Sequence, residues 1–292
     1  MTLDFTGRVA IVTGAGGGLG RQHALALAAR GANVVVNDLA AAQGVVDEIK
    51  AAGGEAIANG ASVTDFAAVQ AMVQQAVDAW GRVDILVNNA GILRDKSFAK
   101  MELADFQLVV DVHLMGAVNC SKAVWALMNE QKYGRIVMTT SSSGLYGNFG
   151  QSNYGAAKMA LVGLMQTLSI EGAKNDIRVN CLAPTAATRM TEGLMPQAVL
   201  DALKPEAVVP AMLVLAAQDA PTRTILCAGA GTFEAAHVTL TNGAFIGIGA
   251  GAPEQLAARL PEITDRTGEQ VPQSGSAQGT NEVGKAMAAA GR

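Results

Sequence analysis

The sequence is poor in cysteine, and its few cysteines fit no known framework. The 292 residues include only Cys120, Cys181 and Cys227, which are widely spaced and form no Cys-x-x-Cys pair. An odd number of separated thiols is typical of reduced cysteines in a cytoplasmic protein, and it argues against a disulfide frame or a zinc site. We therefore expect a cytoplasmic protein with no metal site.

Long runs of one residue type are also missing. Lysine and arginine number 21 against 25 aspartates and glutamates, for a formal charge of −4, and they form no basic run. A surface for nucleic acid or for an anionic membrane is therefore not expected. No uncharged apolar stretch reaches the ~18 residues of a membrane span. The N-terminus lacks the basic and apolar segments of a secretory signal, so none is expected there.

The sequence does contain many apolar residues, and they occur in short runs. Hydrophobic residues make up 50% of the chain and charged residues 16%, which predicts a large core. Strands that alternate with helices are typical of a Rossmann-type, doubly wound α/β fold with helices on both faces. The sequence predicts seven parallel strands within residues 1–250 and a C-terminal extension over 251–292. The apolar runs are 9–12, 33–37, 55–58, 83–87, 135–138, 177–182 and 224–227.

The first run leads into a glycine-rich turn and an alanine-rich helix. The spacing is Gly14-x-x-x-Gly18-x-Gly20. Such glycines permit a tight turn and let backbone N–H groups approach a pyrophosphate at the helix N-terminus. Asp38 ends the second run, close to the ~20 residues after the loop at which an acid can bind the adenosine ribose. Its carboxylate would repel a 2′-phosphate, so NAD is the predicted cofactor. A helix-capping aspartate is the alternative interpretation.

Two later loops also suit a nucleotide. Ser62 and Val63 open the loop in which an adenine ring is expected. Asn88-Asn89-Ala90-Gly91 closes the fourth run, where small residues let a ligand approach and the amides can tie neighbouring loops together. In isolation the same segment is also typical of a plain turn. The charged loop 92–97 is either solvated surface or the rim of a substrate site.

Tyr154 and Lys158 are four residues apart, so a helix here places both side chains on one face. A phenol with a pKa of about 10 is a poor base at neutral pH, and a nearby ammonium group favours the phenolate. Ser141, at the end of the fifth run, can donate a hydrogen bond to an alcohol or carbonyl oxygen. The three groups predict an apparatus that moves a proton while a hydride leaves the adjacent carbon. A lone Tyr-x-x-x-Lys pair is often a surface feature, and the glycine loop favours the catalytic interpretation.

These motifs, together with Thr13 and Pro184, resemble the short-chain dehydrogenase/reductase family over about residues 5–230. The resemblance implies that Tyr154 is the catalytic acid/base, Lys158 its electrostatic partner and a ribose ligand, and Ser141 the donor to the substrate oxygen. It also implies that 186–189 line the nicotinamide. The full set of expected cofactor residues is Gly14, Gly18, Leu19, Gly20, Asp38, Ser62, Val63, Asn89, Ala90, Gly91, Tyr154, Lys158, Pro184, Ala186, Ala187, Thr188 and Arg189.

The substrate is less constrained. The segments 146–151, 189–191 and 203–206 are similar to a branch of the family that oxidises (3R)-hydroxyacyl-CoA thioesters. A 17β-hydroxysteroid or another bulky alcohol is the alternative substrate, and a non-catalytic NAD-binding sensor is the alternative function. Adaptable apolar residues in the loop after Pro184 suit a substrate cover. The expected small-molecule contacts are Ser141, Tyr154, Leu194 and Met195.

His113 stands where the wider family has asparagine, and the branch resembled also carries histidine. Since His113 lies in the middle of a predicted helix, we expect a packed structural residue, or alternatively one that holds water near Lys158. The family pairs its long helix, here about 104–129, and its tyrosine helix between subunits. A homodimer or homotetramer is therefore expected.

Overall fold

The computed structural model describes residues 3–187 and 196–291 of the chain, which forms two compact units. The first unit ends at Ala235 and the second begins at Ala236. This boundary precedes the division at residue 250 that composition suggests. Leu240 exchanges two backbone hydrogen bonds with Gln270, which ties residues before 250 to residues after it. The functional division into a domain over 1–250 and an extension over 251–292 stays a prediction.

The described residues of the first unit build one sheet with strand order β3-β2-β1-β4-β5-β6-β7-β8. The six pairings among the first seven strands are all parallel, which confirms the predicted Rossmann-type α/β fold. The prediction of seven strands missed β8 (Thr232–Ala236), whose residues are mostly exposed and so form no apolar run. The seven parallel strands are β1 (Val9–Thr13), β2 (Asn33–Asn37), β3 (Ala56–Asn59), β4 (Ile85–Asn88), β5 (Gly134–Thr139), β6 (Ile177–Thr185) and β7 (Ile225–Gly229).

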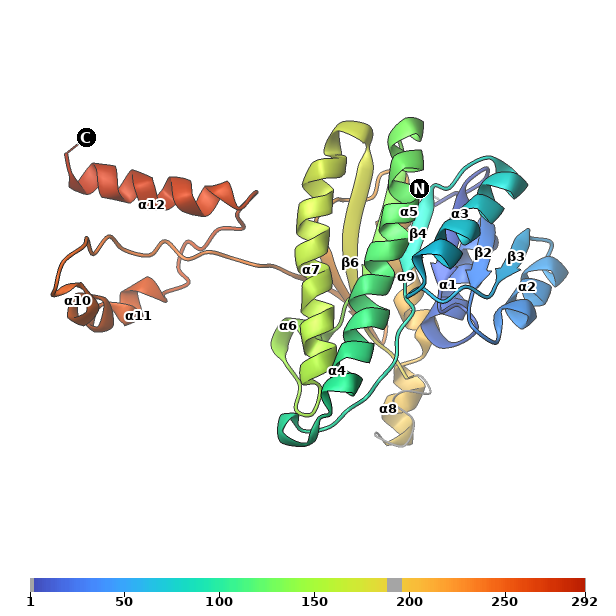
Figure 1. The fold of residues 1–292 in the computed structure, drawn as a ribbon, viewed down its shortest axis with the longest axis horizontal. Helices are drawn as coiled ribbons and strands as arrows, with labels where there is room; N and C mark the ends of the chain where they lie inside the picture. Colours follow the sequence, from blue (N-terminus) through green and yellow to red (C-terminus); the bar gives the residue numbers. More distant parts are fainter. Residues whose placement is uncertain (1–2, 188–195, 292) are drawn as a thin grey trace. The chain divides into compact units, whose positions relative to one another are not determined.

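Helices cover both faces of this sheet, as expected for a doubly wound fold (Figure 1). On one face α1 (Gly18–Ala28), α2 (Ala42–Ala51) and α9 (Val209–Ala216) bury their apolar sides in a single cluster with the strands. On the other face lie α3 (Phe66–Trp80), α4 (Leu103–Val110), α5 (Gly116–Gln131) and α7 (Ser152–Gly172). Two short helices, α6 (Ser142–Tyr146) and α8 (Gln197–Ala202), follow strand ends.

The helix predicted over 104–129 is not one regular α-helix. A π-helical segment, Asp111–Met115, separates α4 from α5 and contains His113. A π-turn widens the helix locally and re-aims the side chains on it. This segment therefore decides where His113 points.

The sheet order places a crevice beside β1. β1 lies between β2 and β4, so the chain winds outward in opposite directions from this point. In open parallel sheets, ligands bind at this reversal, outside the carboxyl ends of the strands. The segments that follow β1, β4, β5 and β6 all start at this edge.

The second unit has no buried residue within 236–291. It contains α10 (Ala252–Ala258), α11 (Leu260–Ile263) and α12 (Ser276–Ala289). Across the described part of the chain, no helix combines the length and the apolar character that crossing a bilayer requires.

Candidate active site

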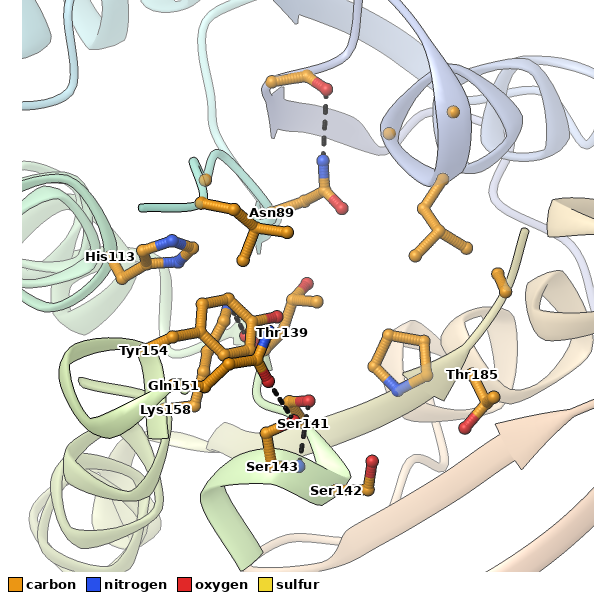
Figure 2. A pocket seen from close by; sticks show the side chains of 18 of the residues that line it. Asn89, His113, Thr139, Ser141, Ser142, Ser143, Gln151, Tyr154, Lys158 and Thr185 are labelled. Carbon is orange, nitrogen blue, oxygen red and sulfur yellow. Dashed lines mark hydrogen bonds between the residues drawn. The ribbon is translucent and has the colours of Figure 1, made fainter. Parts of the chain in front are cut away.

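A pocket of about 470 Å³ opens at the carboxyl ends of the strands (Figure 2). Twelve of the predicted site residues line it. They are Gly14, Gly18, Leu19, Gly20, Asp38, Asn89, Gly91, Ser141, Tyr154, Lys158, Pro184 and Ala186. Ser62 and Ala187 are described but do not line it, and Val63 and Ala90 line a smaller neighbouring cavity. Thr188, Arg189, Leu194 and Met195 lie outside the described residues.

The glycine loop is packed too closely for side chains. Gly14 has φ +61°, and a Cβ on it would lie 2.8 Å from the Cα of Ala90. A Cβ on Gly20 would meet the Gly14 carbonyl oxygen. Gly17, at the N-cap of α1, has no side chain to cap the helix, so the first-turn amides face the pocket. These features match what a pyrophosphate needs.

Asn89 ties the loop after β4 to the glycine loop. Its side-chain amide donates to the carbonyl oxygens of Thr13, at 3.0 Å, and Gly14, at 3.1 Å. The backbone N–H groups of Asn89 and Ala90 donate to the Thr13 hydroxyl. The Asn-Asn-Ala-Gly segment is therefore more than a plain turn, because it fixes the shape of the pocket floor.

Asp38 is held rigidly at the end of β2. One carboxylate oxygen accepts from the N–H groups of Ala40 and Ala41, and the other accepts from Gly16 at 3.1 Å. The residue thus caps the following turn and also faces the glycine loop. The alternative of a helix-capping aspartate is wrong, because the N-cap of α2 is Ala41 and no side chain caps that helix. The role of Asp38 at the ribose stays a prediction.

Tyr154 and Lys158 both rise from α7 into the pocket (Figure 2). The Lys158 ammonium lies 5.5 Å from the centre of the Tyr154 ring and donates to the Thr139 carbonyl. Lys158 is only 3% exposed, and this burial lowers its pKa to about 7. Ser141 is the N-cap of α6 and accepts from the Ser143 N–H at 3.2 Å.

The structure does not show the predicted lowering of the Tyr154 pKa by Lys158. Burial raises the pKa of the phenol, a hydrogen bond with Ser141 opposes the rise, and the Asp95 carboxylate adds to it. The reason is that the phenol and the ammonium are both desolvated, and burial destabilises the charged form of each. Tyr154 is therefore a neutral phenol here.

His113 packs against the tyrosine as a neutral ring. The two rings meet edge to face with centres 5.1 Å apart, and Nε2 of His113 lies 2.8 Å from the Ile92 carbonyl oxygen. Burial, and secondly the charge of Lys158, lower the pKa of His113 to about 3. His113 Nδ1 and Asn88 Oδ1 have no partner among the described residues.

A small cavity lies beside these two unpaired atoms. His113, Asn88 and Lys158 all line it, and its volume of about 10 Å³ matches roughly one water molecule. A water there could donate to both unpaired atoms. This geometry agrees with the expectation that His113 packs structurally or holds water near Lys158.

The pocket residues that were not predicted from the sequence include Asp95, Ser143, Asn148 and Gln151. Gln151 joins the other three by hydrogen bonds, one of which is drawn in Figure 2. The charged loop 92–97 carried a hint, because a substrate rim was one of its two interpretations. No motif or spacing in the sequence indicates that Asp95 contacts Gln151, because the two residues are far apart along the chain.

Comparison with known proteins agrees with this geometry. A family model described as short chain dehydrogenase matches residues 8–198. The peroxisomal multifunctional enzyme type 2 of Drosophila melanogaster is 54% identical over 224 residues, which are 73% of this chain and 37% of that protein. The solved full-length structure of that enzyme superposes with a TM-score of 0.82 at 41% identity, over 95% of this chain and 49% of the other.

Two further proteins are informative. The peroxisomal hydratase-dehydrogenase-epimerase of Saccharomyces cerevisiae is 54% identical over 224 residues, which are 73% of this chain and 25% of that protein. A 7α-hydroxysteroid dehydrogenase, solved with NADH and 7-oxo glycochenodeoxycholic acid, gives a TM-score of 0.73 at 32% identity, over 78% of this chain and 95% of the other. The chain therefore spans a quarter to about half of the curated multifunctional relatives it matches.

Proposed function

The chain belongs to the short-chain dehydrogenase family and is an oxidoreductase acting on CH–OH groups, and from this premise we propose that it is an NAD-dependent (3R)-hydroxyacyl-CoA dehydrogenase. The observation that supports this substrate assignment is the 54% identity to a protein named hydratase-dehydrogenase-epimerase. A hydratase adds water to a double bond, and the alcohol it forms is what a dehydrogenase oxidises. The sequence resemblance to the (3R)-hydroxyacyl-CoA branch points to the same chemistry.

The residues present fit a nicotinamide dinucleotide. The close-packed glycine loop and the open N-terminus of α1 would hold the pyrophosphate, and Asp38 would hold the adenosine ribose. Ser62, Val63 and Ala90 would lie near the adenine side, and the segment from Pro184 through Arg189 would lie near the nicotinamide. The bound cofactor would supply the hydride acceptor.

The pocket residues would handle the proton. Ser141 would donate to the substrate oxygen and fix the reacting carbon. Tyr154 would exchange the hydroxyl proton, and Lys158 would stabilise the phenolate and bind the ribose. Leu194 and Met195 would cover the substrate.

Two alternatives remain open. The 7α-hydroxysteroid dehydrogenase neighbour favours a steroid or another bulky alcohol as substrate. A non-catalytic NAD sensor is the alternative of another class, and the convergence of Ser141, Tyr154 and Lys158 in one pocket argues against it.

Parallel NAD⁺-reduction assays test the proposal. The substrates are (3R)- and (3S)-hydroxyacyl-CoA of several chain lengths and a 17β-hydroxysteroid. We expect turnover of the 3R thioesters. Activity on the steroid alone would refute the thioester assignment, and tight NAD binding without turnover of any alcohol would favour the sensor.

Asp38→Ala is expected to weaken the preference for NAD over NADP by about tenfold or more. A carboxylate beside a 2′-phosphate costs ~1–4 kcal/mol at close range, and ~1.4 kcal/mol is tenfold. The measurement is kcat/KM for each cofactor in the wild type and the variant. Asp47, also acidic but exposed on α2, provides the control Asp47→Ala, which should leave the preference unchanged. Equal use of both cofactors by the wild type would exclude the proposed role of Asp38.

His113→Asn is expected to keep a substantial part of the activity. The histidine is neutral and packed, so it supplies no proton, while asparagine is smaller and still polar. The test compares kcat of this variant with that of Tyr154→Phe at the same pH. A loss as deep as that of Tyr154→Phe would show that His113 takes part in the chemistry.

We also propose a homodimer or homotetramer in the cytoplasm. Large apolar side chains stay exposed on α4 and α7 of the single chain: Leu103, Leu108, Met159 and Ile170. The three free cysteines support a reducing compartment, although the multifunctional relatives are named peroxisomal. A monomeric mass by light scattering at micromolar concentration would refute the oligomer, and cell fractionation tests the compartment.

A further inference from the structure

Asp95 lines the pocket and is held there by Gln151, whose side-chain amide forms hydrogen bonds at both its nitrogen and its oxygen. Gln151 Nε2 donates to Asp95 Oδ2 at 2.7 Å. The other end of the amide, Oε1, accepts from the Ser143 hydroxyl at 2.8 Å and from Asn148 at 3.0 Å. With two donors on its oxygen, the Gln151 amide must turn its N–H group toward Asp95.

The loop that carries Asp95 is also anchored through its backbone. The Lys96 N–H donates to the Gly150 carbonyl at 2.9 Å. The fully buried Asn153 donates to the Arg94 carbonyl at 3.1 Å. Loop 92–97 therefore docks on the start of α7 at three successive residues, and the position of Asp95 does not depend on one contact.

The charge of Asp95 is not neutralised by its basic neighbours. Arg94 and Lys96 both reach Asp105, at 3.7 and 3.4 Å. In the described part of the chain, Asp95 Oδ2 accepts from Gln151, and no partner of Oδ1 is found. The pocket that contains Tyr154 thus has an anionic acceptor in its wall with one oxygen available.

We propose that Asp95 is a specificity-determining residue that accepts the amide N–H of the pantetheine arm of a thioester substrate and disfavours free hydroxy acids. The inference rests on the proposed hydroxyacyl-CoA activity. A pantetheine thioester carries a secondary amide two carbons beyond its sulfur, whereas a free hydroxy acid places a carboxylate near the same region. A carboxylate acceptor strengthens a hydrogen bond to the first and repels the second.

Two synthetic thioesters isolate this contact. One is the N-acetylcysteamine thioester of a (3R)-hydroxy acid, which keeps the amide N–H. The other is the matched S-(2-acetoxyethyl) thioester, in which oxygen replaces that N–H. The third substrate is the free (3R)-hydroxy acid. Values of kcat/KM are measured for each with the wild type, Asp95→Asn and the control Asp78→Asn. Asp78 is exposed on α3, accepts from the Gln74 side chain and does not line the pocket.

Hydrogen bonds to charged groups contribute ~1.5–3 kcal/mol, so the wild type should prefer the amide thioester by about tenfold or more. Asp95→Asn should reduce this preference to within about threefold and raise the relative use of the free acid. Asp78→Asn should keep the wild-type ratios. An unchanged amide preference in Asp95→Asn, with both thioesters oxidised, would overturn the role of Asp95 alone. A wild type that oxidises neither thioester would overturn the proposed function and this inference together.

Discussion

Tyr154→Phe is expected to lower kcat by about 10²–10⁴-fold, the typical contribution of a positioned acid or base. In the proposed mechanism the phenol hydroxyl exchanges a proton with the substrate oxygen, and Tyr154 lines the pocket together with Ser141 and Lys158 (Figure 2). Phenylalanine keeps the ring and its edge-to-face contact with His113. The fold and the affinity for NAD should therefore stay as in the wild type.

The control for this variant is Tyr146→Phe. Tyr146 ends α6, is 72% exposed and does not line the pocket. It should retain most of the activity. The assay is steady-state oxidation of the best substrate, with NAD binding followed by protein fluorescence quenching. Half of the wild-type kcat in Tyr154→Phe would remove Tyr154 from the proposed mechanism.

The parts of the fold that the sequence predicted are those where hydropathy and turn chemistry agree. The runs at 9–12 and 33–37 have apolar centres, and β1 and β2 end at the polar residues Thr13 and Asn37, where the ligand-site loops begin. The sequence did not predict β8, because its side chains are mostly exposed and its residues show no apolar pattern typical of a buried strand. The sequence did not predict the π-helical segment around His113, because the register of backbone hydrogen bonds in a helix does not change the residue types expected there.

The site was predictable only where it is local. Tyr154 and Lys158 share one helix, and the glycines share one loop. The contact between Asp95 and Gln151 joins two segments that are far apart in the sequence and meet only when the loop docks. The spacing of residues in the sequence therefore does not predict it. The pKa of Tyr154 was expected to fall from the charge of Lys158 alone. Its direction depends on how far both groups are buried, and burial follows from the tertiary fold.

Arg135, far from the site, is another residue whose burial could not be predicted from the sequence. In the sequence it is a charged residue at the start of the fifth apolar run, where an exposed strand end is the ordinary expectation. In the structure it has no exposed surface. Its guanidinium stacks 4.1 Å from the centre of the Tyr133 ring and pairs with Asp176 at 2.9 Å. It also donates to the carbonyl oxygens of Gly134, Asp176, Ala217 and Gln218.

Arg135→Met is therefore expected to lower the free energy of unfolding by about 2–4 kcal/mol, because each buried acceptor left without its donor costs ~1–3 kcal/mol. Asp176 adds little to this loss, since it is 43% exposed and keeps Arg178 as a partner. Methionine fills much of the space but leaves several carbonyl oxygens without a donor. Urea unfolding of the purified variant measures the loss. Arg135→Lys should recover only part of it, because an ammonium cannot reproduce the planar fork of donors.

The matched control is Arg21→Met, which breaks a bidentate pair with Glu48 at the surface. Both of its partners are more than a third exposed, at 34% and 44%, so water replaces the lost contact. The expected change is about 0–1 kcal/mol. Equal losses in the two variants would mean that the buried arginine is stabilised no better than a surface one. A larger loss at Arg135 would show that the buried contacts of its guanidinium stabilise the fold, because the two variants remove the same side chain from different surroundings.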